Sequence, residues 1–157
     1  MVFFCYDDFF QIYKHEKRIT SVHVQGSLLA SGSYDKKVRV WNMKMNRQVA
    51  QFQHESDVRC VQLHNTLVLS ASLDNSVKIW ELETGEALHK LAHSGSCNNF
   101  DLSPSQTVLA VACQNAVVLW DFKTAKLFRR NKSKSSIFGT IFSTFDSTLL
   151  AIHLSQV

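Results

Sequence analysis

Three tryptophans divide the chain at nearly equal intervals, and no other feature limits the possible folds as strongly. Trp41, Trp80 and Trp120 are the only tryptophans, and they stand 39 and then 40 residues apart. Each closes a phrase of the same form: SGSYDKKVRVW at 31–41, SASLDNSVKIW at 70–80 and AVACQNAVVLW at 110–120. A fixed period of this length indicates a repeat array, in which neighbouring units bury one another's apolar faces.

Each unit divides into four short strands separated by polar turns. The second unit reads CVQL, turn HNT, LVLSAS, turn LDNS, VKIW, turn ELETGE and ALHKL. Runs such as LVLSA and VVLW are apolar at consecutive positions, so both faces of each small sheet must be covered. The sequence therefore predicts an all-β chain of stacked four-stranded sheets, with units over residues 19–52, 58–91 and 97–130.

The repeats resemble the WD40 family. Units of about 40 residues, with four strands and a tryptophan closing the third strand, are typical of WD40 repeats, which form the blades of a β-propeller. The resemblance covers almost the whole chain and implies a hydrogen-bonded relay of histidine, serine, aspartate and tryptophan within a blade. The matching residues are His15, Ser31, Asp35 and Trp41 in the first unit, His54, Ser70, Asp74 and Trp80 in the second, and only His93 and Trp120 in the third.

The relay has a physical basis of its own. A buried indole N–H needs an acceptor, and a hydroxyl can accept from it and donate onward to an imidazole. The third unit has Ala110 in place of the serine and Gln114 in place of the aspartate, so we expect packing to hold it. Because the set recurs with the repeat, whereas a catalytic nucleophile occurs once in an open cleft, we predict no catalytic residue and no enzyme.

Both ends of the chain carry parts of further units, over residues 2–13 and 137–153. A WD40 ring usually has more blades than three complete and two partial ones. Three arrangements stay open: a fragment of a longer propeller, a ring completed by a second copy, or a small ring closed by a composite blade built from both ends. An unclosed array would expose sheet edges and blade faces and so favour self-association.

The remaining composition excludes several kinds of site. The four cysteines, Cys5, Cys60, Cys97 and Cys113, form no CxxC pair, and we interpret them as reduced core residues. No zinc-like spacing and no phosphate-binding glycine loop occurs, so we predict no metal and no cofactor. The chain has no run of membrane-spanning length and no basic leader, and we expect a cytoplasmic or nuclear protein that contacts no membrane.

The formal net charge is +4, and the basic residues are clustered in the connections, at residues 14–18 and 123–134. Solvated turns are the simplest interpretation, and an acidic or phosphorylated partner is the alternative. Aromatic residues do not alternate with these basic residues as they do in single-strand binders, which argues against a nucleic-acid partner.

Because the strands of a propeller are used in stacking, the resemblance implies a protein-interaction scaffold that acts through its loops. A second resemblance, to the WD40 blades of F-box proteins, implies a substrate receptor of a ubiquitin ligase. A helical F-box upstream in a full-length chain would decide for this alternative. In that subfamily arginines grip phosphopeptides at two places in a blade; Thr20, Arg59 and Asn98 hold the first place here, and Tyr34, Leu73 and Cys113 the second. Only Arg59 has the residue type of that subfamily, with Tyr34 as a hydrogen-bonding or stacking companion. We predict partner binding at Thr20, Tyr34, Arg59, Leu73 and Asn98.

Overall fold

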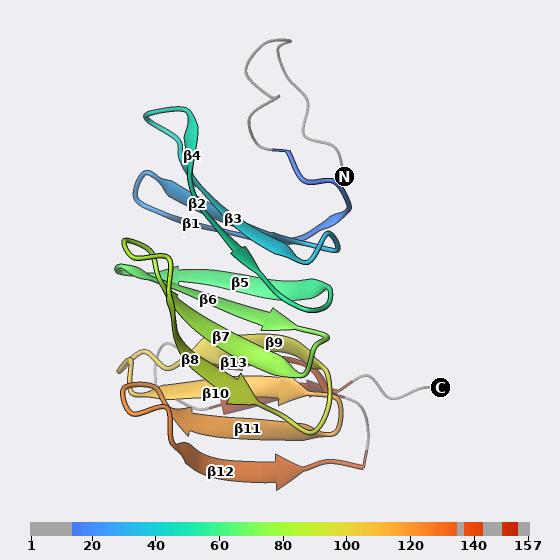
Figure 1. Cartoon of the computed structure of the whole chain (residues 1–157). Coiled ribbons are helices and arrows are strands. Elements are labelled where there is room, and N and C mark those ends of the chain that lie inside the picture. The colour runs from blue at the N-terminus through green and yellow to red at the C-terminus, as the bar shows by residue number, and fades with distance from the viewer. Residues whose placement is uncertain (1–13, 135–136, 143–148, 154–157) are drawn as a thin grey trace.

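The structure is a computed structural model that describes residues 14–134, 137–142 and 149–153 (Figure 1). The first sheet contains β1 (Ile19–Gln25), β2 (Leu28–Ser33), β3 (Lys37–Asn42) and β4 (Arg47–Gln53). The second contains β5 (Val58–His64), β6 (Leu67–Ser72), β7 (Ser76–Glu81) and β8 (Ala87–Ala92). The third contains β9 (Cys97–Leu102), β10 (Val108–Cys113), β11 (Ala116–Asp121) and β12 (Leu127–Lys132). A further pair, β13 (Ile137–Phe142) and β14 (Leu149–His153), ends the array.

Each four-stranded sheet is antiparallel and keeps its strands in chain order. The all-β prediction is confirmed, since the described residues contain no helix and therefore none that could cross a membrane. In Figure 1 the sheets lie one upon the next, with β13 behind β9 and β10, and the described residues do not close into a ring. The partial unit expected at residues 2–13 lies outside the described residues.

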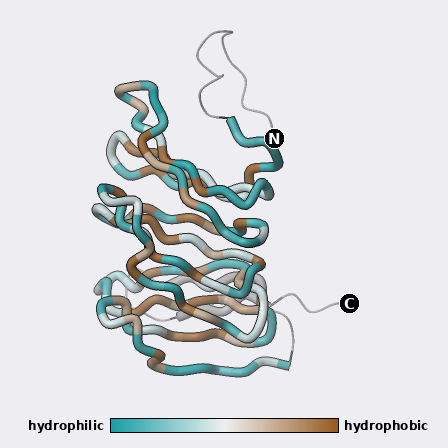
Figure 2. Tube along the Cα trace, in the orientation of Figure 1, coloured by the Kyte–Doolittle hydropathy of each residue, from teal (hydrophilic) through white to brown (hydrophobic). Residues whose placement is uncertain are grey.

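The core lies between successive sheets. Val38, Val40, Val58, Val61 and Leu63 are at most 3% exposed and pack together between the first and second sheets. A second cluster, which includes Leu69, Ile79, Phe100 and Leu109, joins the second sheet to the third. Figure 2 shows apolar strands alternating with polar turns along the stack. The consecutive apolar positions of the central strands therefore serve two neighbours, one on each face.

The first sheet has one face that no described residue covers. Val22 and Val24 of β1 are 53% and 52% exposed. Their counterparts in β5, Val61 and Leu63, are 3% and 2% exposed because the first sheet covers them. The face bearing Val22 and Val24 has the composition of a sheet interface and no partner among the described residues.

The pairing register shows which residues of the third sheet correspond to the relay positions. The paired residues are Leu29 with Trp41, Val68 with Trp80, and Leu109 with Trp120. Ser31, Ser70 and Val111 lie two residues after Leu29, Val68 and Leu109 on β2, β6 and β10. The expectation that Ala110 takes the serine position is therefore wrong; Val111, which has no hydroxyl and is 0% exposed, takes it.

The turn between β10 and β11 is one residue shorter than its counterparts. Three residues separate β2 from β3 and β6 from β7, but only two separate β10 from β11. The backbone N–H groups of Tyr34, Leu73 and Gln114 all donate to the connection that precedes their sheet. Gln114 therefore corresponds to Tyr34 and Leu73, not to an aspartate as the sequence suggested. Cys113 corresponds to Ser33 and Ser72, and the third sheet has no residue at the aspartate position.

Gly32 marks the closest approach of the first two sheets. A Cβ at this position would lie 2.7 Å from Val58 Cγ1 and 2.8 Å from Val61 Cγ1, both in the buried interface. Such distances are too short for carbon atoms in contact, so the sheets would have to separate.

We therefore expect Gly32→Ala to destabilise the chain by about 1–3 kcal/mol, because overpacking a close-packed interface displaces its neighbours. The matched control is Gly95→Ala, where the nearest atom to the new Cβ lies at 3.4 Å. Chemical denaturation measures both variants, and a Gly32→Ala midpoint equal to that of wild type would contradict the tight interface.

Candidate functional site: the relay end of the sheets

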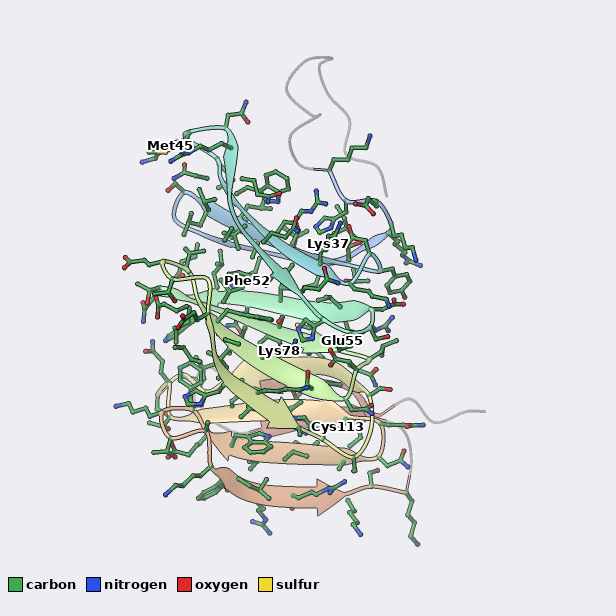
Figure 3. All side chains as sticks on the ribbon, viewed as in Figure 1. Lys37, Met45, Phe52, Glu55, Lys78 and Cys113 are labelled. Atoms are coloured by element: carbon green, nitrogen blue, oxygen red, sulfur yellow. The ribbon has the colours of Figure 1, made fainter. Side chains whose placement is uncertain are left out.

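The histidines and aspartates of the predicted relay and the predicted partner-binding residues lie at or next to one end of the sheets, which we call the relay end. It comprises the turns at 33–37, 72–76 and 113–116 and the connections at 14–18, 54–57 and 93–96. The relay serines and tryptophans lie further along the strands. In Figure 3 the labelled Lys37, Glu55 and Cys113 lie toward this end, whereas Met45 lies at the opposite one.

In the second sheet the structure brings His54, Ser70, Asp74 and Trp80 into one chain of hydrogen bonds. Trp80 Nε1 lies 2.8 Å from Ser70 Oγ, Ser70 Oγ lies 2.7 Å from His54 Nε2, and His54 Nδ1 lies 2.7 Å from Asp74 Oδ2. With a proton on Nδ1, each group donates to the next: indole to hydroxyl, hydroxyl to imidazole, imidazole to carboxylate. Asp74 also accepts from the backbone N–H of Glu55, which ties the turn to the connection before the sheet.

The first sheet repeats this arrangement with His15, Ser31, Asp35 and Trp41. His15 Nδ1 lies 2.9 Å from Asp35 Oδ2, His15 Nε2 lies 2.8 Å from Ser31 Oγ, and Trp41 Nε1 donates to the same Oγ over 3.3 Å. The backbone N–H of Glu16 donates to Asp35 as that of Glu55 does to Asp74.

Burial sets the protonation of this relay. It lowers the pKa of His54, although Asp74 opposes the shift. Burial alone would raise the pKa of Asp74, but hydrogen bonds from Ser76 and His54 outweigh it and hold that pKa below its usual value. A neutral imidazole beside an ionised carboxylate is the state in which every donor of the relay has an acceptor.

These shifts fix the sign of a pH dependence. Because folding lowers the pKa of His54 below 6.5, its contribution to stability is complete above that pH and is lost as the pH falls. Burial also lowers the pKa of His15, His23 and His64, so these residues add to the loss. His54→Gln is expected to be less stable at pH 7 but to lose less stability than wild type between pH 7 and 5. Denaturant midpoints across that range measure this, and equal losses in both proteins would contradict the assigned shift.

In the third sheet the relay is broken in the middle. His93 Nε2 and Trp120 Nε1 are buried, and neither has a hydrogen-bond partner among the described residues. The two rings still meet edge to face with centroids 5.5 Å apart, much as His54 and Trp80 do at 5.8 Å. The missing atom is the hydroxyl oxygen, whose place Val111 occupies. Packing therefore replaces two hydrogen bonds at this point.

Val111→Thr, which changes one methyl into a hydroxyl at nearly constant volume, should stabilise the chain by about 1 kcal/mol, because it supplies an acceptor for Trp120 and a donor for His93. Ser70→Val, the reciprocal change in the second sheet, should destabilise by about 1–3 kcal/mol by leaving two buried groups unpaired. Thermal and denaturant unfolding measure both. A Val111→Thr protein less stable than wild type would show that the hydroxyl does not reach its partners.

Two of the predicted partner-binding residues pair with each other across the first and second sheets. Arg59 Nη1 donates to Tyr34 Oη over 2.6 Å, and the Arg59 guanidinium lies 5.8 Å from the centre of the Tyr34 ring. Arg59 stands near the start of β5 and Tyr34 in the turn after β2. Both side chains are half-buried and reach the surface of the relay end.

Two of the other predicted residues, Thr20 and Asn98, hold sheets together. Thr20 Oγ1 lies within hydrogen-bond distance of the carbonyl oxygens of Gly32 and, in the second sheet, of Val58. Asn98 Nδ2 donates to the carbonyl oxygen of Ile137 in β13 over 3.1 Å. Their polar groups are engaged within the protein. Leu73 is half-buried beside Asp74, and its backbone N–H donates to Asp57.

The structure also gathers residues that the sequence reasoning left apart. Cys97 and Cys113 are register partners on β9 and β10, and His93 Nδ1 lies 3.1 Å from Cys113 Sγ. Their distance in sequence hides them from a search for CxxC spacing, but two cysteines at opposed positions of one hairpin are a usable signal. The hydrogen bond from Cys97, with His93 and Arg130 nearby, lowers the pKa of Cys113, and the same bond together with burial raises the pKa of Cys97. A pocket of about 300 Å³, lined by Cys113, Gln114, Arg130 and Lys132 among others, opens beside this group.

Comparison with known proteins agrees with this architecture. Residues 15–66 match the family model described as TEP-1 C-terminal beta-propeller, and residues 85–121 match that of the WD domain, G-beta repeat. A search of curated proteins found no match. The crystal structure of the computationally designed Ika4 protein is similar with a TM-score of 0.78 and 21% identity, over 92% of this chain and 96% of that one. Together with the three four-stranded sheets, these matches identify the fold as an array of WD40-type β-propeller blades.

Proposed function

We propose that this chain is a non-catalytic scaffold that binds a protein or peptide partner at the relay end, with Arg59 and Tyr34 at the centre of the contact. WD40 propellers generally bind other proteins. The observation that carries the more specific proposal is the Arg59–Tyr34 pair, which bridges two sheets and remains partly accessible.

The pair is prepared for binding before a partner arrives. Only one of the five guanidinium N–H groups of Arg59 is needed for the bond to Tyr34, and no carboxylate of the described residues pairs with Arg59. The remaining donors suit a carboxylate, a phosphate or a backbone carbonyl group. A fixed arginine and a fixed tyrosine lose little conformational entropy on binding, and both types are enriched at interface hot spots.

The surroundings favour an acidic partner. Lys17, Arg18 and Lys36 are exposed on the connections and turns that flank Tyr34. Glu16 already pairs with Lys37 over 2.7 Å, so this acidic neighbour is partly neutralised. Leu73 adds a half-buried apolar contact, whereas Thr20 and Asn98 support the face from within through their bonds between sheets.

The relay gives the reason to propose a non-catalytic protein. Each of the two complete relays uses its serine hydroxyl, both imidazole nitrogens and its carboxylate in one internal chain of bonds. Ser70 is 0% and His54 1% exposed, which leaves a substrate no access to the hydroxyl. We place the protein in the cytoplasm or nucleus as part of the same proposal, and we expect self-association through the uncovered face of β1.

A substrate receptor of a ubiquitin ligase is the second candidate. Arg59 stands at a position from which arginines of F-box proteins with WD40 blades grip phosphopeptides. A phosphate group is usually held by several converging guanidinium groups, and Arg59 is the one arginine at these positions. This candidate therefore requires a marked preference for phosphorylated peptides.

Peptide arrays separate the two candidates. Each acidic peptide is spotted beside a phosphorylated copy and a copy with its acidic residues changed to amides. The scaffold proposal expects binding of the acidic peptides and loss of binding to the amide copies. The receptor proposal expects binding of the phosphorylated copies alone.

For a peptide selected in this way, Arg59→Glu should weaken binding about 10- to 100-fold, since a hydrogen bond to a charged group contributes about 1.5–3 kcal/mol. Tyr34→Phe should weaken it less, by releasing the guanidinium from its fixed position. Arg47→Glu is the control, because Arg47 is exposed at the opposite end of the first sheet. Titration calorimetry measures the affinities, and equal affinities for Arg59→Glu and Arg47→Glu would remove Arg59 from the contact.

A further inference from the structure

We propose that His93, Cys97 and Cys113 form a zinc site in the third sheet. One ligand atom from each residue lies within 4.8 Å of the others, and His93 Nδ1 and Cys113 Sγ are 3.1 Å apart. Tetrahedral zinc, with Zn–S bonds of about 2.3 Å and Zn–N bonds of about 2.0–2.1 Å, requires ligand atoms about 3.5–3.8 Å apart. The separations in the structure, from 3.1 Å between His93 Nδ1 and Cys113 Sγ to at most 4.8 Å within the group, bracket these values.

The repeat shows that this cluster is a departure from the common blade. Cys97 stands where the second sheet has Val58, and Cys113 stands where it has Ser72. The third sheet also lacks the aspartate that holds the Nδ1 atom of the histidine in the other two. Packing alone does not require these cysteines, because valine and serine serve at the same positions. Three separate departures thus place two thiols and an imidazole nitrogen that no carboxylate holds at one point.

The donor set selects the metal. Two thiolates and an imidazole suit zinc, and both sulfur atoms lie in the interior, with Cys97 0% and Cys113 3% exposed. Bound zinc would neutralise two buried thiolates, whose charge would otherwise be costly there. It would also link His93, which lies on the connection before the third sheet, to both strands of the β9–β10 hairpin. The metal would thus do for this sheet what the aspartate does for the others.

The adjoining pocket supplies the fourth position and a route of entry. Its volume is about 300 Å³, Cys113 forms part of its wall, and Arg130 and Lys132 line it. Three protein ligands with one open position are the arrangement in which zinc keeps a water molecule or an external ligand. The cationic lining favours an anionic fourth ligand over a neutral one.

Zinc binding to the full 157-residue chain tests this proposal. Reduced, metal-free protein is titrated with zinc against a chromophoric chelator, and with cobalt, whose thiolate charge-transfer absorption reports Cys ligation. We expect one zinc ion per chain, a cobalt spectrum typical of tetrahedral thiolate ligation, and a zinc-dependent rise in melting temperature.

The repeat itself provides variants that should remain folded. Cys97→Val and Cys113→Ser install the residues that the second sheet uses at these positions, and each should weaken zinc binding on the order of 100-fold or more while the circular dichroism of the sheets is retained. Cys60→Ser and Cys5→Ser are the matched controls and should bind zinc as wild type does.

Three results would overturn the proposal: folded wild-type protein that binds no zinc after full reduction, zinc affinity that Cys97→Val and Cys113→Ser leave unchanged, or cobalt spectra without thiolate absorption. Isolation of the chain with a Cys97–Cys113 disulfide that takes up no zinc after reduction counts with the first of these.

Discussion

The structure depends on one constraint, which is that the second four-stranded sheet is apolar on both faces and must be covered on both. A sheet with one polar, solvent-exposed face needs only one neighbouring sheet. In β6, however, Val68 and Leu69 point to opposite faces and are both 0% exposed, so the second sheet requires a neighbour on either side. Stacking follows from this requirement, and the chain meets it by repeating a unit of about 40 residues. Phe52 of the first sheet, whose ring lies 4.9 Å from that of Trp80, shows how closely one unit packs on the next.

The tryptophans that make this packing possible introduce a polar problem, and the relay solves it. An indole buried between sheets carries an N–H that cannot reach water, so an acceptor must be supplied from within. Ser70 and Ser31 supply this acceptor. Each serine hydroxyl is in turn hydrogen-bonded to a histidine, and that histidine is hydrogen-bonded to an aspartate in the adjacent turn. The same bonds fix the connection that enters each sheet. The same hydrogen bonds thus give the buried indole N–H an acceptor and hold the loops of the relay end in place.

Much of this was accessible from the sequence, because period, strand pattern and relay residues all follow one repeat. The fold class needed only the spacing of the tryptophans and the doubly apolar strands. The third unit was harder, because a longer first turn and a shorter second turn nearly cancel in the spacing between tryptophans. Counting back from Trp120 therefore placed Ala110 at the serine position and Gln114 at the aspartate position. Strand pairing instead places Val111 at the serine position and no residue at the aspartate position. The Cys97–Cys113 contact was missed for the same reason, since register and not spacing brings those side chains together.

The central claim is that successive sheets stack face to face through the ring of Trp80. Nuclear Overhauser effects in the isotope-labelled protein test it most directly. We predict contacts from the Trp80 indole ring to the Phe52 ring of the preceding sheet and to the His54 ring of the relay. A Trp80 ring that shows no contact to Phe52, with contacts confined to its own sheet, would contradict the stacked array.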